Sequence, residues 1–354
     1  MLKLLRYLLA SDKRNASSAP AQAQPAEPPA DLIVVGAESF PLSRHLDTQD
    51  DLPVLDWSAV SKWVEGIETP EHQAEGWSQA ELGWLAHLQA ALGANYRLER
   101  LGQALLLSSL EPNVAQASLT FMNKTLKRIG KVLDGLAQES GWGHDILIVF
   151  DDDDTYYRYI SRYYPEGGEF AGSSGMHINH GCGHFVTMKS DLRVVEPIIA
   201  HEMTHSCLSH LPIPAWLNEG LAVNTEQRLS PPPPPILTPH QMHAKHLKFW
   251  GPTEIQEFWS GKSFLRADDG NMLSYDLARI LVAQFSGEWK TFESFVLAAS
   301  YEDSGQASAA EHLAVDLGAA VCAILERAQS PEWAPLPSAW PETPERGAFH
   351  SDAS

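Results

Sequence analysis

Residues 198–205 read Ile-Ile-Ala-His-Glu-Met-Thr-His, and this stretch decides which fold we expect. On a helix, residues four positions apart lie on one face, so His201 and His205 would present their imidazoles side by side. One metal ion can bridge two imidazoles placed in this way. Glu202 would lie about 100° further around the helix axis, where it can reach a metal-bound water without binding the metal. The stretch therefore predicts a helix that carries two metal ligands and a nearby carboxylate.

Two histidines do not complete a catalytic zinc site, which usually has a third protein ligand and an open position for water. Downstream, residues 214–222 read Pro-Ala-Trp-Leu-Asn-Glu-Gly-Leu-Ala, and thirteen residues lie between His205 and Glu219. This length allows the first helix to end, turn at Pro212 and Pro214, and continue as a second helix alongside the first. Glu219 would then point at the metal from that neighbouring helix.

The two motifs together resemble those of the gluzincin metallopeptidases, the branch of thermolysin and the zinc aminopeptidases, and most closely the compact peptidase MA-like group. HEMTH at 201–205 matches the H-E-x-x-H motif, and WLNEGLA at 216–222 matches the W-L-x-E-G-x-A helix. The resemblance covers roughly residues 97–328. It implies an α+β fold, a zincin-like domain with a small mixed β-sheet, the H-E-x-x-H helix and a helical C-terminal half.

The resemblance also implies roles for individual side chains. His201, His205 and Glu219 match the three zinc ligands, and Glu202 matches the base that takes a proton from water. Tyr275 lies in the segment SYDLARILVAQF, which is similar to the family's downstream Y-x-x-A-x-x-L-V segment. It is either a donor to the tetrahedral oxyanion or a packed aromatic at a helix start. The implied cofactor is Zn²⁺, and the implied substrate is a peptide or protein.

Other polar residues lie close to these motifs in sequence. His177, His180 and His184 are alternative oxyanion donors, although solvated or structural histidines are the more common case. Asn218 and Glu226 are candidates for the hydrogen bonds that orient metal-binding imidazoles.

Two other stretches narrow the interpretation. The GAMEN-type stretch with which aminopeptidases hold a substrate amino terminus is missing, since residues 173–181 read SSGMHINHG. This departure argues against a standard aminopeptidase. His240, His243 and His246 have i, i+3, i+6 spacing but no carboxylate partner in the sequence, so a solvated helix face is favoured over a second metal site.

Outside the motifs, composition divides the chain into four segments. Residues 1–50 include a stretch rich in Ala, Pro, Ser and Gln, so we expect a disordered, low-complexity N-terminal segment. Residues 51–95 carry apolar side chains at helical spacing and predict a small helical region. Residues 96–330 are assigned to the gluzincin-like peptidase domain, and residues 331–354 to a flexible Pro-rich tail.

Within the peptidase-like segment, apolar patterning predicts most of the secondary structure. Asp151 to Asp154 should start a helix through Tyr164, because carboxylates complement the positive end of a helix and these lack the spacing of a calcium loop. The other expected elements are two short strands around Gly102, a helix over 113–136, a buried strand over 146–150, extended pieces near 175–179 and 184–188, a helix from about Pro197, and helices over 275–299 and 307–328.

Charge and composition exclude several classes of function. The formal net charge is −20, from 45 acidic and 25 basic residues, which disfavours binding to nucleic acid. No stretch approaches about 18 consecutive apolar residues, so stable membrane insertion is not expected. Cys182, Cys207 and Cys322 are widely spaced, which disfavours a disulfide framework and a thiolate zinc site.

Two features bear on location and partners. The N-terminal MLKLLRYLLASDKR resembles a signal peptide only superficially because Arg6 interrupts its apolar run. A cytoplasmic location is the default, with export as the alternative. The run Pro231–Pro235 predicts a stiff spacer, or a site for a protein partner that recognises Pro-rich segments.

The motifs favour a zinc-dependent metallopeptidase that hydrolyses peptide bonds with Glu202 as general base. Two other functions stay open. One is a zinc-binding interaction module with little activity, against which Glu202 argues because a structural zinc needs no base. The other is a zinc hydrolase of a non-peptide amide, which would carry the same motifs.

Overall fold

The computed structural model describes residues 29–139, 142–163, 175–190, 192–230 and 237–340. Within these residues the chain is a mixed fold of many helices and small sheets, compatible with the α+β class that the sequence predicts. No single helix among the described residues has the length and apolar character to cross a membrane. Only a pair bent by 88°, Gln306–Leu313 with Leu317–Ile324, reaches that length and composition when both members are combined.

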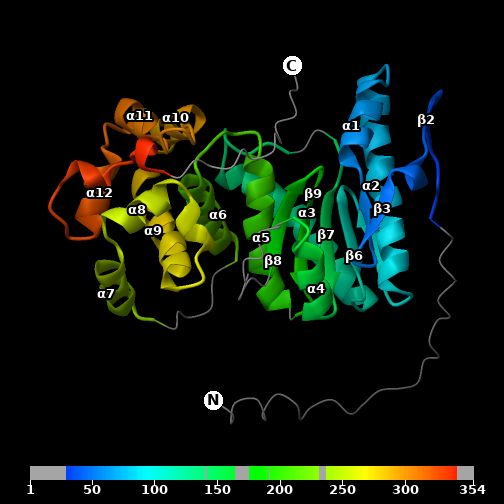
Figure 1. Ribbon diagram of the computed structural model, residues 1–354, viewed down its shortest axis with the longest axis horizontal. Coiled ribbons are helices and arrows are strands. Elements are labelled where there is room, and N and C mark those ends of the chain that lie inside the picture. The colour runs from blue at the N-terminus through cyan, green and yellow to red at the C-terminus, as the bar shows by residue number, and fades with distance from the viewer. Residues whose placement is uncertain (1–28, 140–141, 164–174, 191, 231–236, 341–354) are drawn as a thin grey trace, which may run out of the picture.

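A five-stranded mixed sheet forms the centre of the molecule (Figure 1). Its order is β5-β6-β7-β9-β8, in which β6, β7 and β9 are parallel and the two outer strands are antiparallel to their neighbours. The predicted strands are confirmed, and β8 forms one edge. Their bounds are Arg97–Leu101 for β5, Ala104–Ser108 for β6, Asp145–Phe150 for β7, Gly175–His180 for β8 and Cys182–Met188 for β9.

The central strands are apolar on both faces because both faces are covered. On one face, side chains such as Leu106 and Leu147 share a core with the long helix α3 (Pro112–Val132) and with α5 (Leu192–Leu208). The same core continues through α6 (Ala215–Leu229) and α9 into the C-terminal helices. These are α7 (Pro239–Phe249), α8 (Pro252–Trp259), η2 (Lys262–Leu265), α9 (Asp269–Phe285), α10 (Trp289–Ala298), α11 (Gln306–Ser308), η3 (Ala309–Leu313) and α12 (Leu317–Ile324).

The opposite face of the sheet packs against the N-terminal elements. Ile146 and Ile148 of β7 share a second core with Trp84 and with the tyrosines of α4. In Figure 1 the helices α1 and α2 lie beyond β6, on the far side of the sheet from α5 and α6. The helical region predicted within residues 51–95 consists of two helices, and the helix bounds are Trp57–Glu65 for α1, Pro70–Leu92 for α2 and Asp153–Ile160 for α4.

The prediction of disorder through residue 50 is wrong for residues 33–49. Strands β1 (Ile33–Val35) and β2 (Glu38–Phe40) form one antiparallel hairpin, and β3 (Leu46–Gln49) with β4 (Leu52–Leu55) form another. A short 3₁₀ turn, η1 (Leu42–Arg44), lies between them. Burial in the second core orders these hairpins, through Ile33 and Val35 of β1, Phe40 of β2, and Leu52 and Leu55 of β4. Residues 1–28 lie outside the described residues.

The prediction of a flexible tail is wrong for its first ten residues. Two short turns, η4 (Pro331–Trp333) and η5 (Pro337–Ala339), pack on α8, and Trp333 is buried. The Gln256 amide donates to the carbonyls of Glu332 and Ala334, and it accepts from this segment as well. The rest of the tail and the proline run at 231–235 lie outside the described residues.

Several predicted helix bounds also differ. Helix α5 begins at Leu192 and holds Pro197 inside it, at a position where proline removes one backbone hydrogen bond. The expected helix over 275–299 is two helices, α9 and α10, separated at Ser286 and Gly287. The expected helix over 307–328 is also broken. Asp152 caps α4 by accepting from the Thr155 N–H, as the acidic run predicts, but α4 ends at Ile160.

Asp145, at the start of β7, provides a test of this packing. Burial, together with the charges of Glu139 and Glu81, raises the pKa of Asp145 to about 6. The folded chain therefore binds a proton more tightly than the unfolded chain, and this stabilisation is lost as pH rises from about 4 through 6. We expect Asp145→Asn to raise the free energy of unfolding by about 1–2 kcal/mol at pH 7 and to have little effect at pH 4.

Urea unfolding of wild type and variant at both pH values measures this difference. Asp31→Asn, at an exposed position, is the matched control. A gain from Asp145→Asn that is equal at pH 4 and pH 7 would contradict the assigned cause.

Candidate metal centre

The candidate metal centre lies between α5 and α6, which pack against each other. Ile199 and Met203 bury one face of α5 in the core, so its histidines are turned towards α6. Residues 209–214 form the connection, and Pro214 is the cap from which α6 starts. The backbone therefore brings Glu219, one turn into α6, back over the two histidines, as the sequence predicts.

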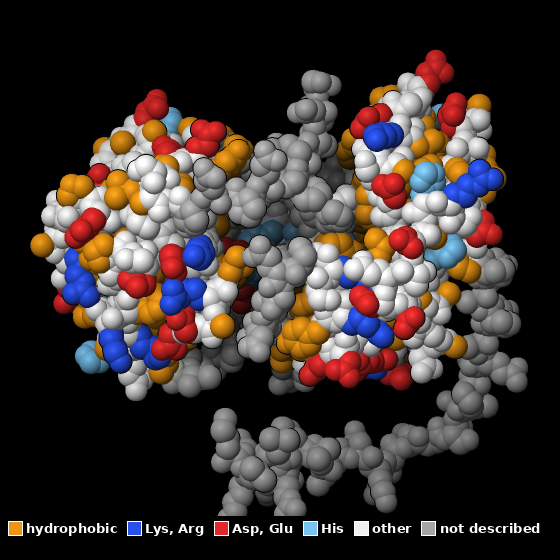
Figure 2. All heavy atoms as spheres, viewed as in Figure 1, with side chains coloured by type: hydrophobic (Ala, Val, Ile, Leu, Met, Phe, Trp, Pro, Cys, Tyr) orange, Lys and Arg blue, Asp and Glu red, His pale blue; other side chains and the backbone are white. Residues whose placement is uncertain are grey.

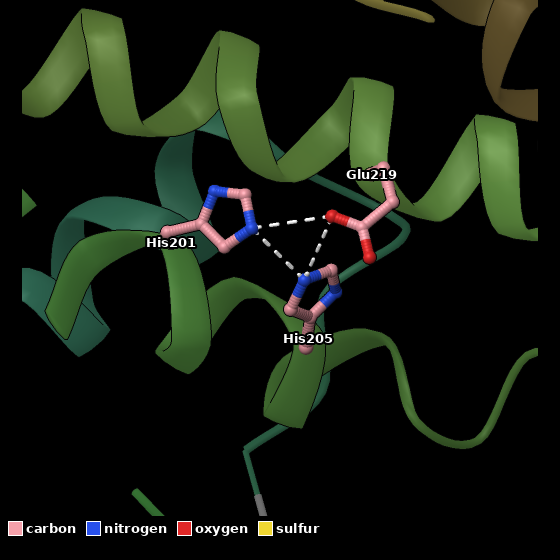
Figure 3. Close-up of side chains that lie close together, drawn as sticks. All are labelled: His201, His205 and Glu219. Atoms are coloured by element: carbon pink, nitrogen blue, oxygen red, sulfur yellow. Dashed lines mark hydrogen bonds and ion pairs between the residues drawn. The ribbon is translucent and has the colours of Figure 1, made fainter. Parts of the chain in front are cut away.

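The three predicted ligands converge (Figure 3). The Oε2 atom of Glu219 lies 3.2 Å from Nε2 of His201 and 3.4 Å from Nε2 of His205. The two Nε2 atoms are 3.1 Å apart. Atoms that bind a tetrahedral zinc ion at about 2.0–2.2 Å lie about 3.4 Å from one another. The spacing therefore fits one small divalent cation, and this is the one such group found among the described residues.

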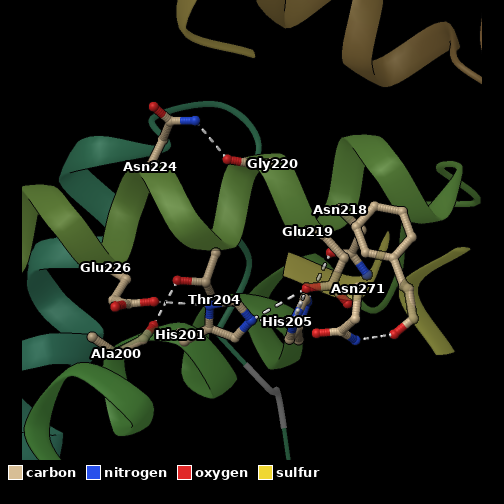
Figure 4. A network of polar contacts seen from close by, with 11 residues as sticks. Ala200, His201, Thr204, His205, Asn218, Glu219, Gly220, Asn224, Glu226 and Asn271 are labelled. Carbon is tan, nitrogen blue, oxygen red and sulfur yellow. Dashed lines mark hydrogen bonds and ion pairs between the residues drawn. The ribbon is translucent and has the colours of Figure 1, made fainter. Parts of the chain in front are cut away.

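A second layer of hydrogen bonds orients the imidazoles (Figure 4). Nδ1 of His201 lies 3.1 Å from Oε2 of Glu226, and Nδ1 of His205 lies 3.1 Å from Oδ1 of Asn218. Each Nδ1–H can donate to its oxygen partner, which leaves the Nε2 lone pair free to bind a metal. Both partners come from α6, the helix that also provides Glu219.

The charges of the group support one another. Burial lowers the pKa of His201, but its hydrogen bonds to Glu219 and Glu226 outweigh this and raise the pKa to about 10. Burial likewise raises the pKa of Glu219, yet the two neighbouring imidazoles hold that pKa well below its usual range. The pKa of His205 is raised because Glu219 outweighs burial. A divalent cation would displace the protons that these imidazoles otherwise hold.

Glu202 lies beside this group without joining it. Burial raises the pKa of its carboxyl group, and the positive charges of His201 and His205 oppose the rise. The carboxylate also accepts a hydrogen bond from the backbone N–H of His177, in the edge strand β8. The sequence offers no local signal for this last contact, because the two residues lie in different elements.

Tyr275, the predicted oxyanion donor, lies on α9 next to the centre. Its ring centroid is 6.2 Å from that of His201, and it also meets the ring of Phe264 edge-on. The structure therefore places it beside a ligand and within an aromatic contact, and both interpretations of the residue remain compatible with its position.

The other histidines differ in their surroundings, and His177 is half-buried with its ring centroid 5.0 Å from that of Phe185. His184 is buried with Nε2 2.7 Å from the Tyr159 hydroxyl, so it is structural. The prediction of a solvated face is wrong for His246, which is 2% exposed with its Nε2 2.9 Å from Asp276. His240 is exposed, and His243 is half-buried with its Nε2 3.1 Å from Oε1 of Glu326. The side chain of His180 lies outside the described ones.

Gly220 explains how closely α6 approaches α9. A Cβ at this position would lie 2.6 Å from the Ala278 carbonyl oxygen and 2.6 Å from a methyl group of Val282. Asn224 then ties the two helices together by donating to the carbonyls of Gly220 and Arg279. The glycine next to Glu219 therefore sets the depth of the helix that carries the third ligand.

No protein-family model matches the chain, and no curated protein matches it. The gluzincin resemblance therefore depends on the two motifs and on the geometry of the site.

We expect Gly220→Ala to destabilise the chain by about 1–3 kcal/mol, because the added methyl group overpacks the contact between α6 and α9. The same change at Gly130 in α3 meets nothing within 4 Å and should instead stabilise by about 0.5–1 kcal/mol through helix propensity. Thermal and urea unfolding show whether each variant is less stable or more stable than wild type. Equal effects at the two positions would show that the approach of α6 to α9 is not tight.

We expect Glu226→Ala to weaken zinc binding about 10–100-fold, because the His201 imidazole loses the partner that orients it. Competition with a chromophoric chelator measures the affinity. Arg228→Gln, at an exposed position of the same helix, is the control. An unchanged affinity in the Glu226 variant would remove this residue from the centre.

Proposed function

We propose that the chain is a zinc-dependent metallopeptidase of the gluzincin type, with a zincin-like peptidase domain. The observation that supports this most strongly is the convergence of His201, His205 and Glu219 beside the buried carboxyl group of Glu202. A purely structural zinc site is normally closed by four protein ligands and has no use for a neighbouring base. Three ligands and a carboxylate are instead the set that hydrolytic zinc sites use.

The donor set fits zinc better than the harder cations. Two imidazole nitrogens and one carboxylate oxygen suit Zn²⁺, whereas calcium and magnesium prefer all-oxygen sites. His201, His205 and Glu219 would hold the ion, and Glu226 and Asn218 would keep the imidazoles aligned. When bound, zinc supplies Lewis acidity, which lowers the pKa of water and polarises a carbonyl group.

The chain's own groups would then move the protons. Glu202 takes a proton from the attacking water and later delivers it to the leaving amine. Its raised pKa suits both steps, because a general acid–base group works best when its pKa is close to the working pH. Tyr275, whose ring centroid lies 6.2 Å from that of His201, would be the donor to the developing oxyanion.

The substrate would be an extended peptide bound beside β8. This strand is the edge of the sheet, and an extended chain can add to such an edge through main-chain hydrogen bonds. His177 of β8 donates to Glu202, so the strand lies next to the reacting groups. In Figure 2, histidine side chains are visible between the C-terminal helices on the left and the remainder on the right.

Two substitutions separate metal binding from catalysis. Glu219→Ala should lose the metal, because two imidazoles alone hold zinc weakly. Glu202→Gln should keep the metal and lose about 10²–10⁴-fold in turnover of a denatured protein mixture, since the amide cannot carry the proton. Metal content by mass spectrometry and peptide release by fluorescence give the two readings.

The outcomes distinguish the competing functions. Normal zinc content in the Glu219 variant would remove the third ligand. Equal turnover by wild type and Glu202→Gln would favour a zinc-binding interaction module. Zinc binding without release of peptides from any protein would favour a hydrolase of a non-peptide amide.

A further inference from the structure

A second group of buried polar residues lies behind β8, the strand proposed to bind the substrate and called here the candidate substrate edge. This group is on the opposite face of the sheet from the candidate metal centre. Glu81 of α2 is 2% exposed, and its Oε2 lies 2.6 Å from Nδ1 of the buried His144. Its Oε1 accepts from the Trp77 indole N–H at 3.0 Å and from the Cys182 thiol at 3.7 Å. Burial of an ionisable pair is expensive, so its position calls for a physical reason.

The pair lies where the N-terminal helices meet the β8–β9 hairpin. Gly181, the single residue between the two strands, has φ +68°, and a Cβ there would lie 2.1–2.4 Å from atoms of Trp57 in α1. The turn therefore lies directly against the indole, with no room for a side chain. Cys182, the next residue, contacts Glu81 of α2.

Beyond the turn, strand β9 is held in place by side chains of α2 and α4. The ring of His184 meets that of Trp84 at a centroid distance of 5.1 Å, and its Nε2 lies 2.7 Å from the Tyr159 hydroxyl. Its Nδ1 lies 2.8 Å from the carbonyl oxygen of Cys182, which stiffens the start of β9. The hairpin is thus fixed at its turn and along β9 by elements outside the metal-binding helices.

The fixed hairpin is the one that contains the candidate substrate edge. β8 pairs with β9 along its whole length, from Gly175 opposite Thr187 to His180 opposite Cys182. Any displacement of the turn is therefore passed to β8. The same strand provides the His177 N–H that binds Glu202. The position of α1 and α2, together with that of α5, which also contacts both strands, thus determines where a peptide main chain would lie relative to the reacting groups.

We propose that α1 and α2 form a brace for substrate binding, in which Trp57 and the buried Glu81–His144 pair hold the β8–β9 hairpin in place for an extended peptide. The role of the brace in substrate binding rests on the proposed peptidase activity. The anchoring of the hairpin by α1 and α2 does not depend on that activity. Glu81, His144 and Trp57 are positioning residues, because they act on the substrate only through the hairpin.

The experiment compares two pairs of variants of the full chain. Gly181→Ala places a methyl group into Trp57, whereas Gly183→Ala, in the same hairpin, meets only Nε2 of His177 at 3.6 Å, an ordinary contact. Glu81→Gln replaces the buried carboxyl group with an amide, whereas Glu75→Gln makes the same change at an exposed position of α2. The second pair keeps the test decisive if Gly181→Ala does not fold.

Hydrogen exchange and steady-state kinetics give independent readings. In Gly181→Ala and Glu81→Gln we expect amides of residues 175–188 to exchange about tenfold faster, the change that one charged hydrogen bond is commonly worth. KM for an extended peptide should rise about tenfold as well, while zinc content and kcat stay within about twofold. Gly183→Ala and Glu75→Gln should match wild type in hairpin exchange.

Each alternative outcome has a definite meaning. Wild-type exchange in the hairpin of both test variants would overturn the brace. Faster hairpin exchange with unchanged KM would overturn its role in substrate binding. Wild-type protein that hydrolyses no peptide would refute the proposed function instead, and the exchange comparison would still decide whether α1 and α2 hold the hairpin.

Discussion

The close approach of α6 to both α5 and α9 is the constraint on which the candidate centre depends. Glu219 can reach both imidazoles only because α6 returns directly over α5, with Oε2 3.2 Å and 3.4 Å from the two Nε2 atoms. Gly220 lies on the side of α6 that faces α9. Because it has no side chain, the backbones of these two helices can come into contact. The candidate ligand and the residue that places it are therefore neighbours in sequence, and they face two different helices.

The same helix orients the other two ligands. Asn218 and Glu226 hold the Nδ1 atoms of His205 and His201, so α6 fixes the tautomer and ring position of both imidazoles. Helix α5 contributes the rings and the neighbouring carboxyl group of Glu202. One helix pair thus carries all three candidate ligands, and pre-organisation of this kind would lower the cost of binding an ion.

The sequence predicts the centre well because its signals are local. His201 and His205 need only one helical turn, and Glu219 needs one reversal of the chain within a short distance. Features that depend on contacts between residues far apart in the sequence cannot be predicted from local signals. The two hairpins within residues 33–55 are ordered by burial against α2, and Trp333 is ordered by its place beside α8. His246 has no carboxylate nearby in sequence, yet α9 brings Asp276 to 2.9 Å.

An open strand edge that binds peptides is also an edge that can pair with the wrong chain. β8 has six residues, and the N–H of His177 is already bonded to Glu202, so the length of edge open to another strand is small. A short edge gives few main-chain hydrogen bonds, and their strength then depends on how accurately the strand is placed. Anchoring of the hairpin by Trp57 and by the contacts of His184 supplies that accuracy from the opposite face of the sheet. A rigid support behind a short edge would therefore reconcile the proposed peptide binding with resistance to unwanted strand pairing.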